Sequence, residues 1–275
     1  MILPPAAAGL AKLRAMSLPV AESRPPQLEL AQGVARITLR RPAHRNRLHN
    51  EDLAFLMESF ARVDADPTVR VLVLQAQVLP HRPVFSAGYN IDEFQGGRPP
   101  VPFEDVVDAL ERVRPVTLCV LEGSVYGGAT DFVLASDLAL AADDIEMRMP
   151  AAALGMHYYP SGLRRYVSRL GVAAAKRAFL TAEAIDAQTL LRIGYVQELL
   201  PRATLHARVD ALAAQIASLA PLALESLKQS LNELARGEWE PERLRTRAAD
   251  SMASDDFAEG QRAFQEKRRP QWKGR

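Results

Sequence analysis

Apolar runs of strand length alternate with helical stripes along the first part of the chain. Residues 34–39 alternate in polarity with a period of two, which predicts a half-buried strand. Apolar residues then recur at helical spacing after Asn50, which we expect to cap a helix that closes at 64–67. The continuous apolar runs 71–74 and 116–121 are typical of strands covered on both faces. Strands that alternate with helices predict an α/β layer fold.

The chain beyond Pro160 has helical periodicity throughout. One apolar stripe runs over 209–219, Pro221 interrupts it, and a second stripe runs over 224–234. The start of the chain is different, because it is rich in Ala and Pro and has no clear period. We therefore expect three parts: a loosely ordered leader at 1–27, an α/β core at 28–205 and a helical region for oligomerisation at 206–275.

Composition excludes several classes of function. The chain has 275 residues, of which 48% are hydrophobic, as expected of a globular protein with a sizeable core. The sum of 34 basic and 33 acidic residues is +1, so no global field attracts nucleic acid or an anionic membrane. Cys119 is the single cysteine, which excludes an intrachain disulfide and a Cys-based zinc site. We expect a cytoplasmic protein that holds no metal and contacts neither a membrane nor nucleic acid.

Two loops rich in small residues follow buried strands. The loop 122–128 leads into a predicted helix, whose first N–H groups lie at the positive end of its dipole. Such a turn suits a phosphate or an enolate-type oxyanion, but G-x-G-x-x-G and a Gly-Lys-Ser/Thr ending are both absent. The other loop, 84–92, follows a neighbouring strand. We therefore expect the N–H groups of Ala87 and Gly128 to converge on one carbonyl oxygen as an oxyanion hole.

With these loops in order, the chain resembles the crotonase family, also called the enoyl-CoA hydratase/isomerase superfamily. The resemblance implies a ClpP/crotonase-like spiral of ββα units with a helical C-terminal region. It also implies an acyl-CoA thioester as substrate, no cofactor beyond the coenzyme A of that substrate, and a homotrimer or homohexamer. The motifs that carry the resemblance are Arg41-Pro42 with Asn46, F-S-A-G at 85–88, E-G-S-V-Y-G-G-A at 122–129, Ser136-Asp137, Met149-Pro150, Gly171 and the segment 254–270.

The resemblance also bears on the reaction. Hydratases of this family use two glutamates, whose positions here hold Asp131 and Ala151, so the second carboxylate is absent. The motifs are more similar to the methylmalonyl-CoA decarboxylases of the family, in which the tyrosine at the position of Tyr158 helps to hold the carboxylate that leaves. Tyr89 stands where those decarboxylases have a histidine.

The sharper hypothesis is therefore an acyl-CoA lyase that decarboxylates a methylmalonyl-CoA-type substrate through a thioester enolate. An enoyl-CoA hydratase or isomerase that uses Asp131 alone is one alternative, and a non-catalytic CoA- or RNA-binding family member is another. The implied catalytic residues are Ala87, Gly128, Asp131 and Tyr158. The implied substrate- and CoA-binding residues are Arg45, Asn46, Ser86, Gly88, Tyr89, Ile91, Tyr126, Gly127, Pro150, His157 and Lys267.

Overall fold

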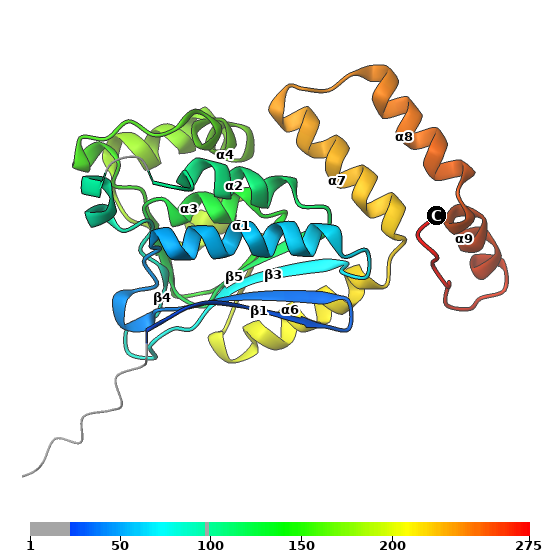
Figure 1. The fold of residues 1–275 in the computed structure, drawn as a ribbon, viewed down its shortest axis with the longest axis horizontal. Coiled ribbons are helices and arrows are strands. Elements are labelled where there is room, and N and C mark those ends of the chain that lie inside the picture. Colours follow the sequence, from blue (N-terminus) through cyan, green and yellow to red (C-terminus); the bar gives the residue numbers. More distant parts are fainter. Residues whose placement is uncertain (1–22, 97–98) are drawn as a thin grey trace, which may run out of the picture.

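A six-stranded sheet forms the centre of the N-terminal part of the protein (Figure 1). The computed structural model describes residues 23–96 and 99–275. The strands lie in the order β1-β2-β3-β5-β7-β10, with β1 and β2 antiparallel and every other neighbouring pair parallel. Their bounds are β1 (Arg24–Ala31), β2 (Val34–Arg40), β3 (Val71–Ala76), β5 (Val116–Leu121), β7 (Leu138–Ala142) and β10 (Glu198–Leu200).

A smaller sheet is built from the second strand of each successive unit. It has the order β4-β6-β8-β9. Three successive pairs of strands contribute one strand to each sheet: β3 and β4, β5 and β6, and β7 and β8. A helix follows each pair. This repetition confirms the predicted ββα units. The strands are β4 (Val84–Ser86), β6 (Ser124–Tyr126), β8 (Glu146–Arg148) and β9 (Ile185–Asp186).

Helices cover both sides of the large sheet. Helices α1, α2 and α3 lie on one side and α6 on the other (Figure 1). The strands β3 and β5 between them are buried almost throughout, as their apolar runs predict. The helices are α1 (Asn50–Ala65), α2 (Phe103–Arg112), α3 (Ala129–Ala135), α4 (Pro160–Thr181), α5 (Ala187–Arg192) and α6 (Arg202–Ala217), with 3-10 turns at Pro42–His44, Ile91–Gly96 and Ala152–Leu154.

Two local expectations are wrong. The N-cap of α1 is His49 rather than Asn50, and its N–H donates to the carboxylate of Asp52 at 2.9 Å. The predicted leader is wrong at its end, because β1 begins at Arg24 and pairs with β2. β1 is a largely exposed edge strand, and polar and apolar residues alternate in it only over 27–30. The remainder of the predicted leader, residues 1–22, lies outside the described residues.

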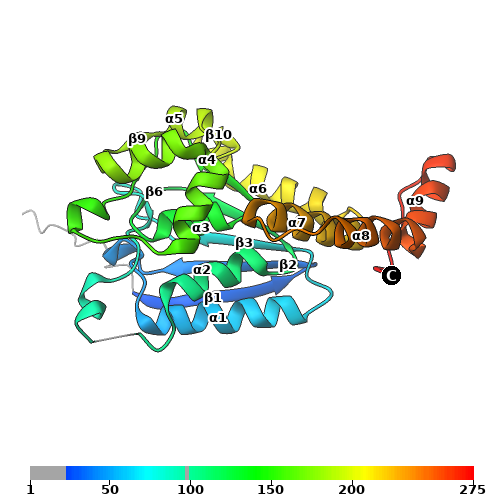
Figure 2. The same ribbon diagram turned by 90° about the horizontal axis from the view of Figure 1, so that it is seen from above.

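The C-terminal helices form an arm that extends away from the sheets (Figures 1 and 2). The arm consists of α7 (Pro221–Arg236), α8 (Pro241–Ala253) and α9 (Asp255–Gln265). Pro221 starts α7, where its missing N–H is no loss. Within the described ranges no single helix has the length and apolarity of a membrane span, although the bent pair of α6 and α7 passes that test on length and composition.

Lys228 ties α7 to the sheet. Its Nζ lies 2.8 Å from a carboxylate oxygen of Asp137 and donates to the carbonyl of Pro115 at 2.7 Å. The side chains of Lys228 and Asp137 are only 7% and 19% exposed. Loss of the ammonium leaves a carboxylate without its counter-ion in a mostly buried position, which is costly.

We expect Lys228→Met to lower the free energy of unfolding by about 3 kcal/mol, measured by urea denaturation. Arg245→Met is the control, since the ion pair of Arg245 with Glu242 is exposed, and its loss should cost about 0.5 kcal/mol or less. Equal losses in the two variants would contradict the role given to Lys228.

Candidate active site

An apolar cavity of about 290 Å³ lies where both Gly-containing loops meet the segment that precedes α4. Eight of the residues predicted from the sequence line it together: Ala87, Tyr89, Ile91, Gly127, Gly128, Pro150, His157 and Tyr158. The other lining residues are Phe103, Met149, Ala151, Leu154, Met156 and Tyr159. The cavity therefore gathers residues from both loops, from the start of α2 and from the segment before α4, which are far apart in the sequence.

The two loops touch at Gly88. This residue has φ +87°, and a Cβ added to it would lie 2.8 Å from the nitrogen of Gly128 and 3.0 Å from the carbonyl oxygen of Tyr126. Both the backbone angle and the contact thus require glycine. The expectation that the loops lie side by side is confirmed.

Asn46 and Ser86 support the first loop from below the surface. The amide of Asn46 donates to the carbonyls of Gln77 at 2.8 Å and Val84 at 3.1 Å. The hydroxyl of Ser86 donates to the carbonyl of Asn46 at 2.7 Å and accepts from the N–H of Gly88 at 3.1 Å. Both side chains are buried and neither lines the cavity, so they hold the loop rather than bind a ligand.

The predicted donor pair of the oxyanion hole needs correction. The N–H of Ala87 donates to the carbonyl of Arg45 at 2.8 Å, so it is already engaged inside the protein. No acceptor for the N–H of Gly128, at the start of α3, lies among the described residues. Of the two predicted donors, only the N–H of Gly128 therefore has no partner among the described residues, and Gly128 lines the cavity.

Asp131 is held behind the cavity wall. It is fully buried, and its two oxygens accept from Nε and Nη2 of Arg165 at 2.9 and 2.7 Å. The hydroxyl of Tyr159 donates to the second oxygen at 2.6 Å. Asp131, the predicted catalytic carboxylate, therefore does not line the cavity. Tyr159 lines the cavity and contacts Asp131 behind it.

Arg165 is itself buried and shared by several carboxylates. Nη1 donates to Asp108 at 2.7 Å and lies 3.6 Å from Glu111. Burial lowers the pKa of Arg165, but the hydrogen bond and charge of Asp131, with those of its other partners, more than offset this and raise the pKa above its ordinary value. Arg165 is thus a permanent cation that keeps Asp131 in place.

Tyr158 and Tyr159 form a stacked pair on the wall of the cavity. Their ring centroids are 4.2 Å apart, and their hydroxyl oxygens are 3.0 Å apart. Gly162 permits this arrangement, because an added Cβ would lie 2.4 Å from the ring of Tyr158. Burial and then the charge of Asp131 raise the pKa of both hydroxyls well above the usual range. Both tyrosines therefore stay protonated at neutral pH.

The described residues that line the cavity include no Asp or Glu. Ala151 stands where the resemblance places the second glutamate of hydratases. His157 is the one histidine among those lining residues, and its Nδ1 lies 2.8 Å from the carbonyl oxygen of Tyr158. Since a carbonyl only accepts, Nδ1 carries the proton in that bond. The wall thus offers hydrogen bonds and an apolar surface, but no carboxylate base.

Three predicted binding residues lie away from the cavity. Arg45 is exposed on the surface, and the hydroxyl of Tyr126 donates to Glu146 at 2.9 Å. Lys267 follows α9, at the opposite end of the molecule from the start of α4 (Figure 1). A single copy of the chain does not bring these residues to the cavity.

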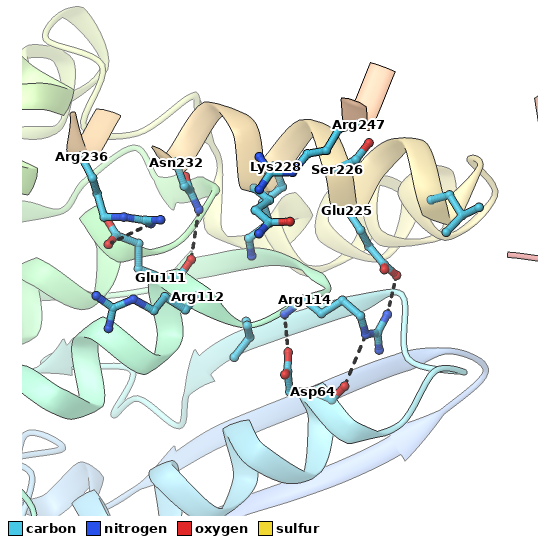
Figure 3. Close-up of a pocket in the computed structure, with 13 residues that line it drawn as sticks. Asp64, Glu111, Arg112, Arg114, Glu225, Ser226, Lys228, Asn232, Arg236 and Arg247 are labelled. Atoms are coloured by element: carbon cyan, nitrogen blue, oxygen red, sulfur yellow. Dashed lines mark hydrogen bonds and ion pairs between the residues drawn. The ribbon is translucent and has the colours of Figure 1, made fainter. Parts of the chain in front are cut away.

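A larger cavity, of about 540 Å³, lies between the end of α2 and α7 (Figure 3). Its wall is charged, and some of the charged residues contact one another. Arg114 bonds to Asp64 through its backbone N–H at 2.6 Å and to Glu225 through its side chain at 2.5 Å. Asn232 donates to the carbonyl of Glu111 at 3.0 Å. None of the predicted site residues lines this cavity, so we place the chemistry in the apolar one.

A protein-family model described as enoyl-CoA hydratase/isomerase matches residues 29–275. The chain belongs to this family. It is a crotonase-superfamily enzyme acting on acyl-CoA.

The relatives of this crotonase-superfamily enzyme differ in reaction. The chain is 31% identical over 218 residues to methylmalonyl-CoA decarboxylase of Escherichia coli, covering 76% of this chain and 82% of that one. It is 28% identical to carnitinyl-CoA dehydratase of Proteus mirabilis, over 79% of this chain and 87% of the relative.

Solved structures agree on the fold. An enoyl-CoA hydratase/isomerase family protein from Hyphomonas neptunium superposes with a TM-score of 0.82 at 24% identity, covering 93% of this chain and 100% of that one. DspI of Pseudomonas aeruginosa superposes with a TM-score of 0.80 at 28% identity, over 94% of this chain and 100% of that one. The crotonase fold expected from the motifs is confirmed.

Neither Arg165 nor the bond of Tyr159 to Asp131 was predicted from the sequence of this crotonase. Arg165 carries no local motif, because its role comes from a carboxylate 34 residues away. The sequence indicates Tyr159 only by its position, as the second of two adjacent tyrosines just before the proline that starts α4.

We expect Gly88→Ala to destabilise the protein by at least about 2 kcal/mol more than Gly155→Ala, measured by urea denaturation. Gly155 is a matched control because it also has positive φ, +68°, but no described atom lies within 4 Å of an added Cβ. Both variants carry the backbone strain, and only Gly88→Ala also forces apart the two loops. Similar losses in both variants would show that the contact with Gly128 carries no energetic weight.

Proposed function

We propose that this protein removes CO2 from an acyl-CoA that carries a carboxylate on its α-carbon, with methylmalonyl-CoA as the reference substrate. The observation that carries the proposal is a cavity that has no carboxylate in its described wall and includes the N–H of Gly128. Water addition needs an acid and a base at the substrate. Decarboxylation needs only a thioester that accepts the electron pair as a stabilised enolate.

The chemistry follows from that wall. The bond between the α-carbon and the carboxylate breaks, CO2 leaves, and the electron pair moves into the thioester as an enolate. A proton from water then joins the α-carbon, so methylmalonyl-CoA and one proton yield propionyl-CoA and CO2. The reaction uses no group beyond the coenzyme A of the substrate.

Three features of the cavity favour this reaction. The apolar side chains, Met149 and Leu154 among them, remove water from the carboxylate and so weaken its solvation. We assign the N–H of Gly128 as a donor for the enolate oxygen, and one such donor is typically worth about 3 kcal/mol of the barrier. Tyr158 supplies the hydroxyl that meets the carboxylate.

The alternatives have less support. A hydratase or isomerase that works with Asp131 alone needs that carboxylate at the substrate, and Arg165 and Tyr159 occupy both of its oxygens. A net charge of +1 does not favour an RNA-binding protein. The similarity to the decarboxylase of Escherichia coli supports the lyase.

Purified protein incubated with methylmalonyl-CoA should form propionyl-CoA by mass spectrometry, and crotonyl-CoA should gain no water. We expect Tyr158→Phe to raise KM for methylmalonyl-CoA by about fivefold, since the lost hydroxyl contacts the carboxylate before it leaves. Tyr195→Phe is the matched control, because this buried tyrosine donates to the carbonyl of Thr130 and does not line the cavity. Hydration of crotonyl-CoA without release of CO2 would overturn the proposal.

We also propose that the protein assembles as a homotrimer or homohexamer through α7. Three leucines of the second predicted stripe are solvent-exposed in the single chain: Leu227 is 60%, Leu231 63% and Leu234 46% exposed. A row of exposed leucines on one helix is a typical contact surface between protein chains. Such an assembly would give Lys267 a route to the cavity of another copy.

Leu231→Glu should shift the protein from the oligomer toward the monomer, because it places a charge in the proposed contact. Multi-angle light scattering after size-exclusion chromatography measures the mass, and Glu242→Gln on exposed α8 is a surface control. An unchanged oligomer in Leu231→Glu would place the contact elsewhere.

A further inference from the structure

The hydroxyls of Tyr158 and Tyr159 form a hydrogen-bond chain with a fixed direction. A carboxylate only accepts hydrogen bonds, so Tyr159 gives its one proton to Asp131 in the 2.6 Å contact. Its oxygen is then an acceptor in the 3.0 Å contact with Tyr158. The one proton of the Tyr158 hydroxyl is therefore directed toward Tyr159, and away from any ligand.

The surroundings hold this direction in place. Arg165 binds both oxygens of Asp131, and each of these two residues is at most 1% exposed. The tyrosine rings stack on each other, and the ring of Phe179 lies 5.2 Å from that of Tyr158, centroid to centroid. The end of the chain at Asp131 is thus anchored by charge, and the end at Tyr158 by packing.

We propose that Tyr159 is a positioning residue that withholds the proton of Tyr158 from the carboxylate of the substrate. This inference rests on the proposed decarboxylation. A bound carboxylate gains the proton of Tyr158 only when that proton leaves Tyr159, so one hydrogen bond is exchanged for another. Tyr158 consequently binds the carboxylate of the substrate more weakly than it would if its hydroxyl had no bond to Tyr159.

Weak binding of the carboxylate suits this reaction. The negative charge leaves the carboxylate as CO2 forms, so a strong bond to it stabilises the ground state more than the transition state. Such a bond lowers KM and lowers kcat with it. Tyr159, anchored by Asp131, therefore limits how far Tyr158 stabilises the substrate before the bond breaks.

Tyr159→Phe removes the competing acceptor and keeps the ring. We expect KM for methylmalonyl-CoA to fall about fivefold, the worth of one neutral hydrogen bond, and kcat to fall with it. Inhibition by propionyl-CoA, which has no carboxylate, should stay within about twofold of the wild type, because the thioester end is unchanged. A loss of affinity for both thioesters would assign Tyr159 a merely structural role and overturn the inference.

The double variant tests whether Tyr159 acts through Tyr158. In the Tyr158→Phe background there is no proton to withhold, so adding Tyr159→Phe should leave KM and kcat unchanged. Such complete coupling is the signature of two residues that act as one unit. Independent, additive effects of the two substitutions would contradict the chain. Tyr195→Phe again reports the cost of a buried tyrosine hydroxyl lost outside the cavity and should leave the ratio of the two affinities unchanged.

The failure of this inference can be told apart from the failure of the proposed function. If the wild type releases no CO2, the proposed reaction falls, and methylmalonyl-CoA becomes a stable ligand for titration calorimetry. Tighter binding of methylmalonyl-CoA, but not of propionyl-CoA, by Tyr159→Phe would still support a withheld proton. Equal or weaker binding of both would overturn it.

Discussion

The buried ion pair between Asp131 and Arg165 is the interaction on which one side of the cavity depends. It joins α3 to α4, and the contact of Arg165 with Asp108 brings in α2. Removing two charges from water is costly, and only full pairing offsets that cost. Here both carboxylate oxygens and three nitrogens of the guanidinium are bonded. Loss of Arg165 would leave the buried carboxylate of Asp131 without its counter-ion, and loss of Asp131 would remove the acceptor of the Tyr159 hydroxyl.

The opposite side of the cavity depends on backbone rather than charge. The ββα repeat brings β4 and β6 together, and the turns that follow them meet where Gly88 has no side chain. That meeting places the N–H of Gly128 beside an apolar wall, and such a donor is able to stabilise an oxyanion. In the proposed reaction this part of the fold holds the thioester oxygen, and Tyr158 meets the carboxylate.

The C-terminal arm differs from the core in how its apolar side chains are covered. In α6 the apolar stripe is buried against the sheet, whereas in α7 much of it faces solvent. Lys228 and Arg114 attach α7 to the core by polar contacts instead. An arm held in this way leaves its leucines for another surface, which is why the oligomer is part of the proposed function.

Much of the architecture was determined by the sequence alone. Period-two and helical patterns predicted β2, α1 and α6, continuous apolar runs predicted β3 and β5, and the two loop motifs predicted a shared cavity. These predictions are correct because each of them depends on residues that are only a few positions apart in the sequence. β1 was missed for the same reason, since as an exposed edge strand its only guide is the partner strand.

The tertiary structure alone decided which polar groups reach the cavity. Ala87 was expected to offer its N–H, but that group bonds to Arg45, and Asp131 was expected at the substrate, but Arg165 and Tyr159 hold it. A motif names a residue type and its place in the chain, while a hydrogen bond depends on the distance and direction of a partner far away in sequence. The chemistry of this site is therefore set by contacts that no local pattern records.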